Sequence, residues 1–204
     1  MVKKGIILDA KFSFLPHIKD MCGKANRMTK ALLRLRSYLT FDQAKILCHS
    51  FILSGFNYCP LVWMFCGRTG NNLIVTAHRR ALRAVINDFS LPYEVMLSRL
   101  ETTSIHVKNI RVLVIELYKT FNSLNPEFMS VFFSLTNPSY NLRCGSLMNV
   151  PRVKLTVGIN SLSFRAALAW NHLPKDVKES SSLASFKKSL AEKQLYCKCS
   201  ICSK

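Results

Sequence analysis

The sequence predicts a mainly α-helical protein: a helical bundle with a short N-terminal strand and a small β hairpin in its C-terminal part. Three observations support this class. Apolar residues recur at spacings of three and four through several long segments, and capping residues stand before most of them. Apart from a short apolar run at residues 5–8, turn-rich and β-prone stretches gather after about residue 137. With 49% hydrophobic residues and only seven glycines and seven prolines, the chain can bury a core.

The first expected element is a short strand at residues 5–8, of sequence GIIL. No segment before it is available for pairing, and a lone strand can neither bury itself nor satisfy its backbone. We therefore expect an unpaired strand here, as if the chain had been truncated before it.

The second expected element is a helix over residues 17–39, where the apolar residues form a single helical stripe. The opposite side of this helix carries cations at spacings of three and four: Lys24, Arg27, Lys30 and Arg34. Like charges stacked in this way repel one another unless an anion lies alongside. The pattern is equally compatible with a solvated helix face.

Thr40 and Gln43 form a capping box that predicts another helix, running to a stop near Gly55. A short segment over residues 60–65 follows and carries Trp63, which we expect in the core. Asn71 or Asn72 is then expected to cap a long helix. Its polar side carries a second basic stripe: His78, Arg79, Arg80 and Arg83.

The rest of the chain predicts shorter helices. They are expected to start at Ser90–Pro92, Ser104, Asn125–Pro126, Ser163 and Ser182. A hairpin or pair of strands is expected between residues 147 and 157. We divide the chain into residues 1–89, residues 90–136 as further helices packing on them, a small α+β region at 137–196, and a cysteine-rich tail at 197–204.

Residues 46–67 contain no Lys, Arg, Asp or Glu, a stretch long enough to span a bilayer. Gly55, Pro60 and several polar residues interrupt it, so two buried helices that meet at a break explain it better. No segment resembles a signal peptide. We therefore expect an intracellular chain, in cytoplasm or nucleus, in which four cysteines act as small buried hydrophobes: Cys22, Cys48, Cys59 and Cys66.

The charge balance indicates the partner. Lys and Arg outnumber Asp and Glu by 29 to 11, which gives a net charge of +18. Nucleic acid is the expected partner, because each phosphate neutralised by a cation releases condensed counterions. A membrane surface, or a basic surface with no dedicated ligand, are the alternatives.

Catalysis is not expected of this chain by itself. Two-metal chemistry needs carboxylates close together, yet the aspartates lie in separate predicted elements, and no glycine-rich phosphate loop or HExxH motif is present. Cys197, Cys199 and Cys202 have a spacing that could supply three thiolates to zinc, with Cys144 or His172 as a fourth ligand. The alternative is that they are free thiols.

Seven motifs follow one another along the chain: residues 5–18 (GIILDAKFSFLPHI), 56–63 (FNYCPLVW), 78–88 (HRRALRAVIND), 140–143 (YNLR), 163–174 (SFRAALAWNHLP), 185–188 (SFKK) and the terminal CxCxxC. Together, in this order, they resemble the region that follows the polymerase core in reverse transcriptases of LINE-type (non-LTR) retrotransposons, the jockey-like group in particular. The ordered set covers nearly the whole chain.

The resemblance implies that the N-terminal strand is the end of the palm and that the helices up to about residue 89 form the thumb. In such RNA-directed DNA polymerases the thumb grips template–primer nucleic acid through its backbone. The candidate phosphate contacts are then Lys24, Arg27, Lys30, Arg34, Arg79, Arg80 and Arg83. Expected partners are RNA or an RNA–DNA duplex, and the palm and fingers of a full-length parent.

The family's fingers and palm, with their paired metal-binding aspartates, have no counterpart in this sequence. The chain is therefore expected to be a truncated transposable-element fragment that is inactive alone, without the magnesium of the parent polymerase. Two alternatives stay open. One is a helical module that binds an acidic protein or the missing palm, and the other is a membrane anchor through residues 46–67.

Overall fold

The computed structural model describes residues 5–133, 135–136 and 147–193. It is mainly helical, as predicted, and divides into two compact units, Met1–His106 and Val107–Lys204. The boundary between these units falls inside helix α6 (Ile105–Phe121). The expected divisions at residues 89, 136 and 196 stay predictions.

The first unit begins with the long helix α1 (Leu15–Leu35), which a 3₁₀ turn η1 (Arg36–Tyr38) extends. Helix α2 (Phe41–Leu47) starts at the predicted capping box: the Gln43 N–H donates to the Thr40 side chain, and the Thr40 N–H donates to the Gln43 side chain. A π-helical turn η2 (Cys48–Ile52) and a 3₁₀ turn η3 (Leu53–Asn57) continue it to the predicted stop.

Three further helices complete the first unit: α3 (Pro60–Trp63), α4 (Gly67–Ile86) and α5 (Tyr93–Arg99). Helix α4 starts earlier than the expected cap at Asn71 or Asn72, so that prediction was wrong. The first turn of α4, before Asn71, packs against α1. Gly70 in this turn is buried, and a Cβ there would lie 3.0 Å from Ile18 Cδ1 of α1, so close packing accompanies the earlier start.

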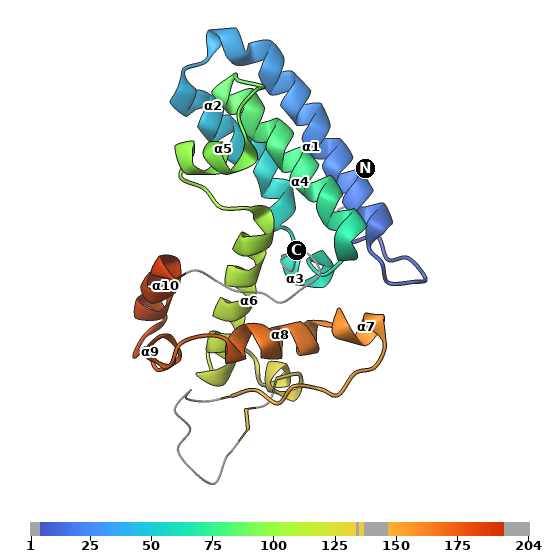
Figure 1. Ribbon diagram of the computed structural model, residues 1–204, viewed down its shortest axis with the longest axis vertical. Coiled ribbons are helices and arrows are strands. Elements are labelled where there is room, and N and C mark those ends of the chain that lie inside the picture. The colour runs from blue at the N-terminus through green and yellow to red at the C-terminus, as the bar shows by residue number, and fades with distance from the viewer. Residues whose placement is uncertain (1–4, 134, 137–146, 194–204) are drawn as a thin grey trace. The chain divides into compact units, whose positions relative to one another are not determined.

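Helices α1 and α4 run parallel and side by side (Figure 1). Near their starts Ile18 meets Gly70. Near their ends the Arg36 Nε donates a hydrogen bond of 3.0 Å to the Val85 carbonyl. Small side chains on α4, such as Ala77 and Ala81, are fully buried and allow this close approach.

The strand predicted at residues 5–8 is not seen, and no segment in the described part of the chain pairs with these residues. Instead the Ile7 N–H donates to His17 Nδ1 at 3.5 Å. Asp9 then holds the chain at the entrance to α1 by accepting hydrogen bonds from the Ser13 N–H, the Ser13 hydroxyl and the Phe14 N–H.

The second unit contains shorter helices around an aromatic cluster. After α6 come η4 (Glu127–Val131), α7 (Thr156–Ile159), α8 (Leu162–Asn171), α9 (Lys175–Lys178) and α10 (Leu183–Glu192). Tyr118 stacks on Phe186 with centroids 4.1 Å apart, and Phe121 meets Trp170 edge-on at 4.8 Å. Trp170 is 2% exposed and Trp63 is fully buried, which confirms that both belong to the core.

The predicted β hairpin is not seen in the described part of the chain. In the stretch expected to form it, Met148 makes an isolated antiparallel bridge to Leu135, and the backbone over residues 149–155 is irregular up to the start of α7. Asn171 explains the difference: its side chain accepts from the Met148 N–H and donates to the Met148 carbonyl, at 2.8 and 3.0 Å. One side chain from α8 thus takes the bonds that a second strand would have made.

Two further expectations concern the apolar stretch at residues 46–67 and the cysteines. Among the described residues, no helix has the length and apolar character needed to cross a membrane.

Cys22 and Cys48 are buried as predicted, and burial raises the pKa of Cys48 to about 12. Cys66 is half-buried. Cys59 is exposed, so its predicted burial was wrong: it lies at the start of α3 with a positive φ of 44°.

Candidate nucleic-acid interface

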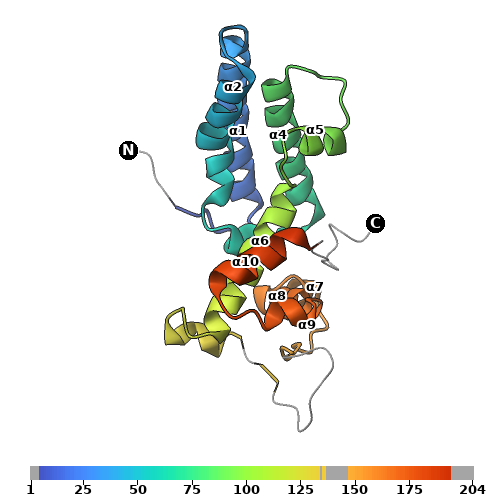
Figure 2. The same ribbon diagram turned by 90° about the vertical axis from the view of Figure 1, so that its left-hand side faces the viewer.

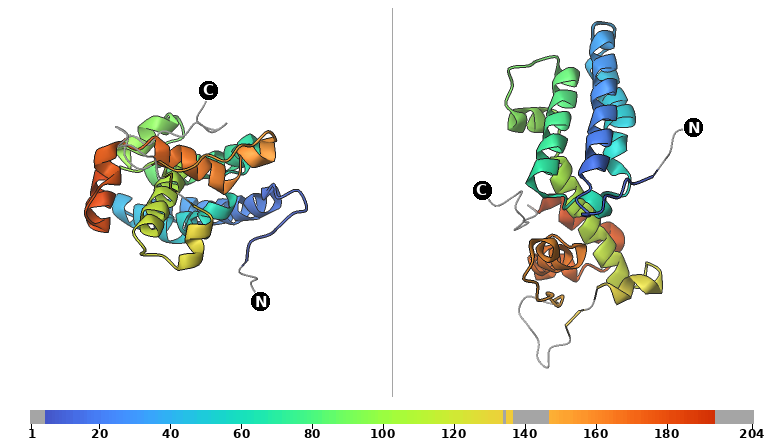
Figure 3. Two further views of the ribbon diagram at one scale, coloured as in Figure 1. Left: turned by 90° about the horizontal axis from the view of Figure 1, so that it is seen from below. Right: turned by 90° about the vertical axis from the view of Figure 1, so that its right-hand side faces the viewer.

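The candidate site is the side of the α1–α4 pair that is turned away from α2, η2 and η3. On α1, Met21 and Met28 line a groove with η2 and η3. On α4, Leu82 and Val85 line a small cavity with Cys48, at the start of η2. The opposite sides of α1 and α4 therefore share one exposed surface. In Figure 2 helix α2 lies in front of α1, and in the right-hand view of Figure 3, taken from the other side, α1 lies in front of α2 with α4 beside it.

On α1, the position of each cation follows from the helical rotation of about 100° per residue. Lys30 lies about a third of a turn from Ile18, which faces α4, and almost opposite Met21 and Met28, which face η2. Arg34 and Arg27 lie further around, toward the outer edge. All three are exposed.

On α4, the same rotation places Arg80 roughly a quarter-turn from Gly70, the residue that faces α1, and nearly opposite Leu82 and Val85. Arg83 lies one step further around, at the far edge of the same side. Arg80 is exposed. Arg83 is half-buried, and its buried Nε has no hydrogen-bond partner among the described residues.

Residues of α1 can also be matched with residues of α4 at the same level along the helix axes. The pairs Ile18–Gly70 and Arg36–Val85 show that each residue of α1 lies beside the residue about 50 positions later on α4. Lys30 is therefore level with Arg80, and Arg34 is level with Arg83. We call these cations the outer basic face: Lys19, Arg27, Lys30, Arg34, Arg80 and Arg83.

Lys19 is part of this face but was not among the residues predicted from sequence. It is exposed and lies three helical turns before Lys30, on the same side of α1. The signal that could have found it is this eleven-residue spacing, because three full turns return to nearly the same angle.

Two predicted contact residues lie elsewhere. Lys24 lies at the lip of the groove toward η2 and forms an ion pair of 2.7 Å with Asp20. Arg79 points toward α5, where its guanidinium lies 5.5 Å from the centre of the Tyr93 ring. His78, a member of the second stripe, is buried and shares a hydrogen bond of 2.7 Å with the Tyr93 hydroxyl.

The outer basic face is not neutralised internally. The salt bridges found among the described residues involve Lys24, Lys119, Lys175 and Lys193, and none of them includes a cation of this face. The face therefore presents several adjacent positive charges to solvent, an arrangement that costs free energy unless an anion offsets it.

The candidate zinc ligands Cys197, Cys199 and Cys202 lie outside the described residues, as does Cys144. His172, the other candidate, is exposed and lies at the end of α8, with its Nδ1 2.7 Å from the Leu168 carbonyl. In the part of the chain that is described, no group of three or more His, Cys, Asp or Glu residues could hold a metal ion.

Comparisons with known proteins give no match: none is found among protein-family models, curated proteins or solved structures.

Proposed function

We propose that this chain is a non-catalytic fragment of a LINE-type retrotransposon reverse transcriptase, and that its outer basic face grips RNA–DNA template–primer duplex through the phosphates. The observation that carries this proposal is the alignment of Lys30 with Arg80, and of Arg34 with Arg83, on one exposed side of two parallel helices. The ordered motifs described above are the reason for naming this family.

The dimensions of the face suit a nucleic-acid strand. Lys19 and Arg34 are separated by about 22 Å along α1, at 1.5 Å per residue. A strand of duplex carries one phosphate per roughly 3.4 Å of helix axis, so the face runs beside about six phosphates. Long helices hold the cations in line, which favours repeated backbone contacts over contacts to individual bases.

This mode of binding is expected to be independent of sequence. Arginine and lysine side chains that meet phosphates position a duplex but carry no base information directly. Polymerisation would need the palm aspartates of the parent enzyme, and the aspartates described here occupy separate elements, such as Asp42 in α2 and Asp176 in α9.

The test is the salt dependence of binding to an RNA–DNA hybrid of about 12 base pairs, measured by fluorescence anisotropy. If about five cations reach phosphates, log affinity falls against log salt with a slope of roughly −4 to −5. A slope near zero, or no binding at 50 mM salt, would remove the proposal. A DNA duplex of the same length shows whether hybrid geometry is preferred.

A further inference from the structure

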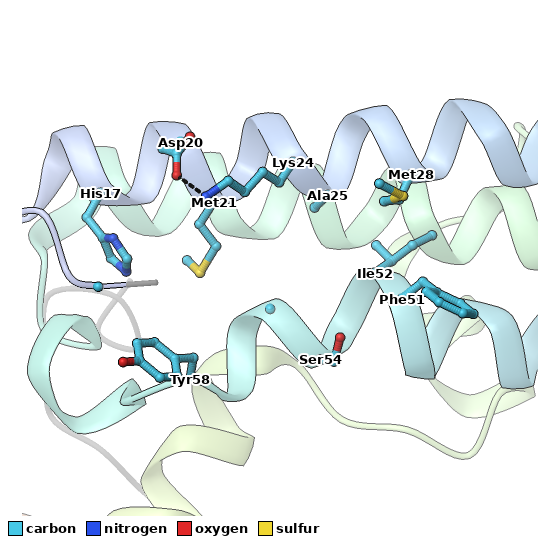
Figure 4. A pocket seen from close by; sticks show the side chains of 12 residues that line it. His17, Asp20, Met21, Lys24, Ala25, Met28, Phe51, Ile52, Ser54 and Tyr58 are labelled. Atoms are coloured by element: carbon cyan, nitrogen blue, oxygen red, sulfur yellow. Dashed lines mark ion pairs between the residues drawn. The ribbon is translucent and has the colours of Figure 1, made fainter. Parts of the chain in front are cut away.

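A groove of about 640 Å³ lies on the other side of α1, between this helix and the η2–η3 segment (Figure 4). Its α1 wall contains an apolar strip, Met21, Ala25 and Met28, with His17, Asp20 and Lys24 beside it. The three residues of the strip are spaced at i, i+4 and i+7, so the strip is continuous along the helix.

The opposite wall is formed by an irregular helical segment. Ile52 is buried beneath the groove, and the rings of Phe51 and Tyr58 stand at its rim. Gly55 lies between them without a side chain, and a Cβ built there would meet nothing within 4 Å. π-helical turns such as η2 occur often at functional sites.

This apolar surface is left open to solvent. Met28 is 47% exposed, Phe51 66% and Tyr58 51%, and all three line the same groove. Clustered exposed apolar side chains, unlike scattered ones, mark interaction sites. Methionine suits such a role because its flexible side chain adapts to a partner's shape.

The groove is elongated. It follows α1 from His17 to Met28, about 16 Å at 1.5 Å per residue. That length matches three turns of a partner helix, which would present apolar residues at i, i+4 and i+7.

Charge indicates the chemistry of the partner. Asp20 is the acidic residue in the groove lining, and Lys24 already pairs with it at 2.7 Å. Arg27, one turn beyond Lys24 on the same helix, is exposed. A second copy of this chain would bring another net charge of +18 to the groove, whereas an acidic segment would be attracted to it.

We propose that this groove binds an amphipathic helix of a partner protein, with three apolar side chains seated against Met21, Met28 and Phe51 and with carboxylates beside Lys24 and Arg27. The groove lies on the side of α1 opposite Lys30, and Arg27, at the edge of the outer basic face, is the residue that the two proposals share. The remaining groove residues lie outside that face, so the two proposals can be tested separately.

The probe is a fluorescein-labelled peptide of 14 residues, with leucines at positions 4, 8 and 11, alanines between them and glutamates on the remaining face. A matched peptide carries lysine in place of each glutamate. With the full chain in anisotropy titrations, we expect the glutamate peptide to bind at least tenfold more tightly than the lysine peptide.

Two glycine substitutions of the same size provide the decisive contrast. Gly55→Leu fills the groove, where space is open, and is expected to weaken the glutamate peptide at least tenfold. Gly23→Leu places the same side chain on α1 away from the groove and leaves the groove open. Because its Cβ would lie 3.8 Å from Arg27 Nη1, a loss of no more than about threefold is expected, well short of the loss for Gly55→Leu. Phe51→Ala removes an exposed rim residue and should weaken binding about fivefold.

Several results would overturn the proposal. One is peptide binding that Gly55→Leu and Phe51→Ala leave unchanged, which would place the peptide on the outer basic face by charge alone. A second is the absence of any peptide binding by a chain with a native circular dichroism spectrum. A third is a dimer in sedimentation experiments that Gly55→Leu dissociates, which would make a second copy the occupant. Hybrid-duplex binding by Gly55→Leu, measured in parallel, shows whether the duplex proposal fails separately.

Discussion

Helix α1 has two exposed sides that differ in chemistry and in how they are built. The outer basic face combines cations from α1 and α4, two helices about 50 residues apart in sequence, and carries no internal ion pair among the described residues. The groove side is mainly apolar, and the Asp20 carboxylate in its lining is paired with Lys24. The net charge of the whole chain, +18, does not show that the two sides differ. Only the rotation of each side chain around α1 assigns it to one or the other.

The largest effect is expected when charge is reversed on the outer basic face and, separately, away from it. The double variant Lys30→Glu, Arg80→Glu alters the centre of the outer basic face and should weaken hybrid binding at least a hundredfold, about 2.7 kcal/mol. The double variant Lys24→Glu, Arg79→Glu changes the net charge equally but away from that face, so a loss of about threefold or less is expected. Anisotropy at fixed salt measures both. Equal losses would mean that total charge, and not this face, attracts the duplex.

The comparison also depends on close contact between α1 and α4. A Cβ at Gly70 would lie 2.6 Å from Cys66 Sγ and 3.0 Å from Ile18 Cδ1, so Gly70→Ala should lower the free energy of unfolding by about 1–3 kcal/mol. Gly23→Ala, on the open side of the same pair, should raise it by about 0.5–1 kcal/mol because alanine favours a helix. Urea denaturation compares them. Stabilisation by both would contradict the packing described for α1 and α4.

Tyr93 tests whether Arg79 truly lies outside the outer basic face. Tyr93→Phe removes the hydroxyl that hydrogen-bonds to buried His78, at an expected cost of about 1–2 kcal/mol in unfolding free energy. The aromatic ring beside Arg79 is retained. Hybrid binding by the folded variant should stay within twofold of the natural chain, and a larger loss would return the α5 side to the binding surface.

The smallest expected effect concerns the loop before α1. Partial desolvation disfavours the charged Asp9 carboxylate, but hydrogen bonds from Ser13 and Phe14 outweigh it and hold its pKa below the ordinary 3.8. The resulting stability is fully present above that value and is lost as the pH falls through the folded-state pKa. The melting temperature of Asp9→Asn should therefore lie below that of the natural chain at pH 6, and the gap should narrow below pH 4. A gap that persists unchanged to pH 2.5 would rule out this role.

The sequence by itself determined the local features of this protein. Helical periodicity and capping residues predicted α1, α2, α6 and α10, because a helix and its caps depend on residues three and four positions apart. Trp63 and Trp170 were predicted as core residues because each lies on an apolar helix face, and the cations of α1 were predicted as an exposed stripe for the same reason.

Only the tertiary structure decided which distant groups meet. In it, Lys30 lies level with Arg80, and Lys24 and Arg79 lie outside the shared face. It also places open space beside Gly55, in the groove. The predictions of a strand and a hairpin were wrong for a related reason, because β pairing needs a partner segment. Residues 5–8 have no such partner among the described residues, and Asn171 takes the backbone hydrogen bonds of Met148. Side-chain periodicity sets which way a residue points on its own helix, but the parallel packing of α1 and α4 sets what it points beside.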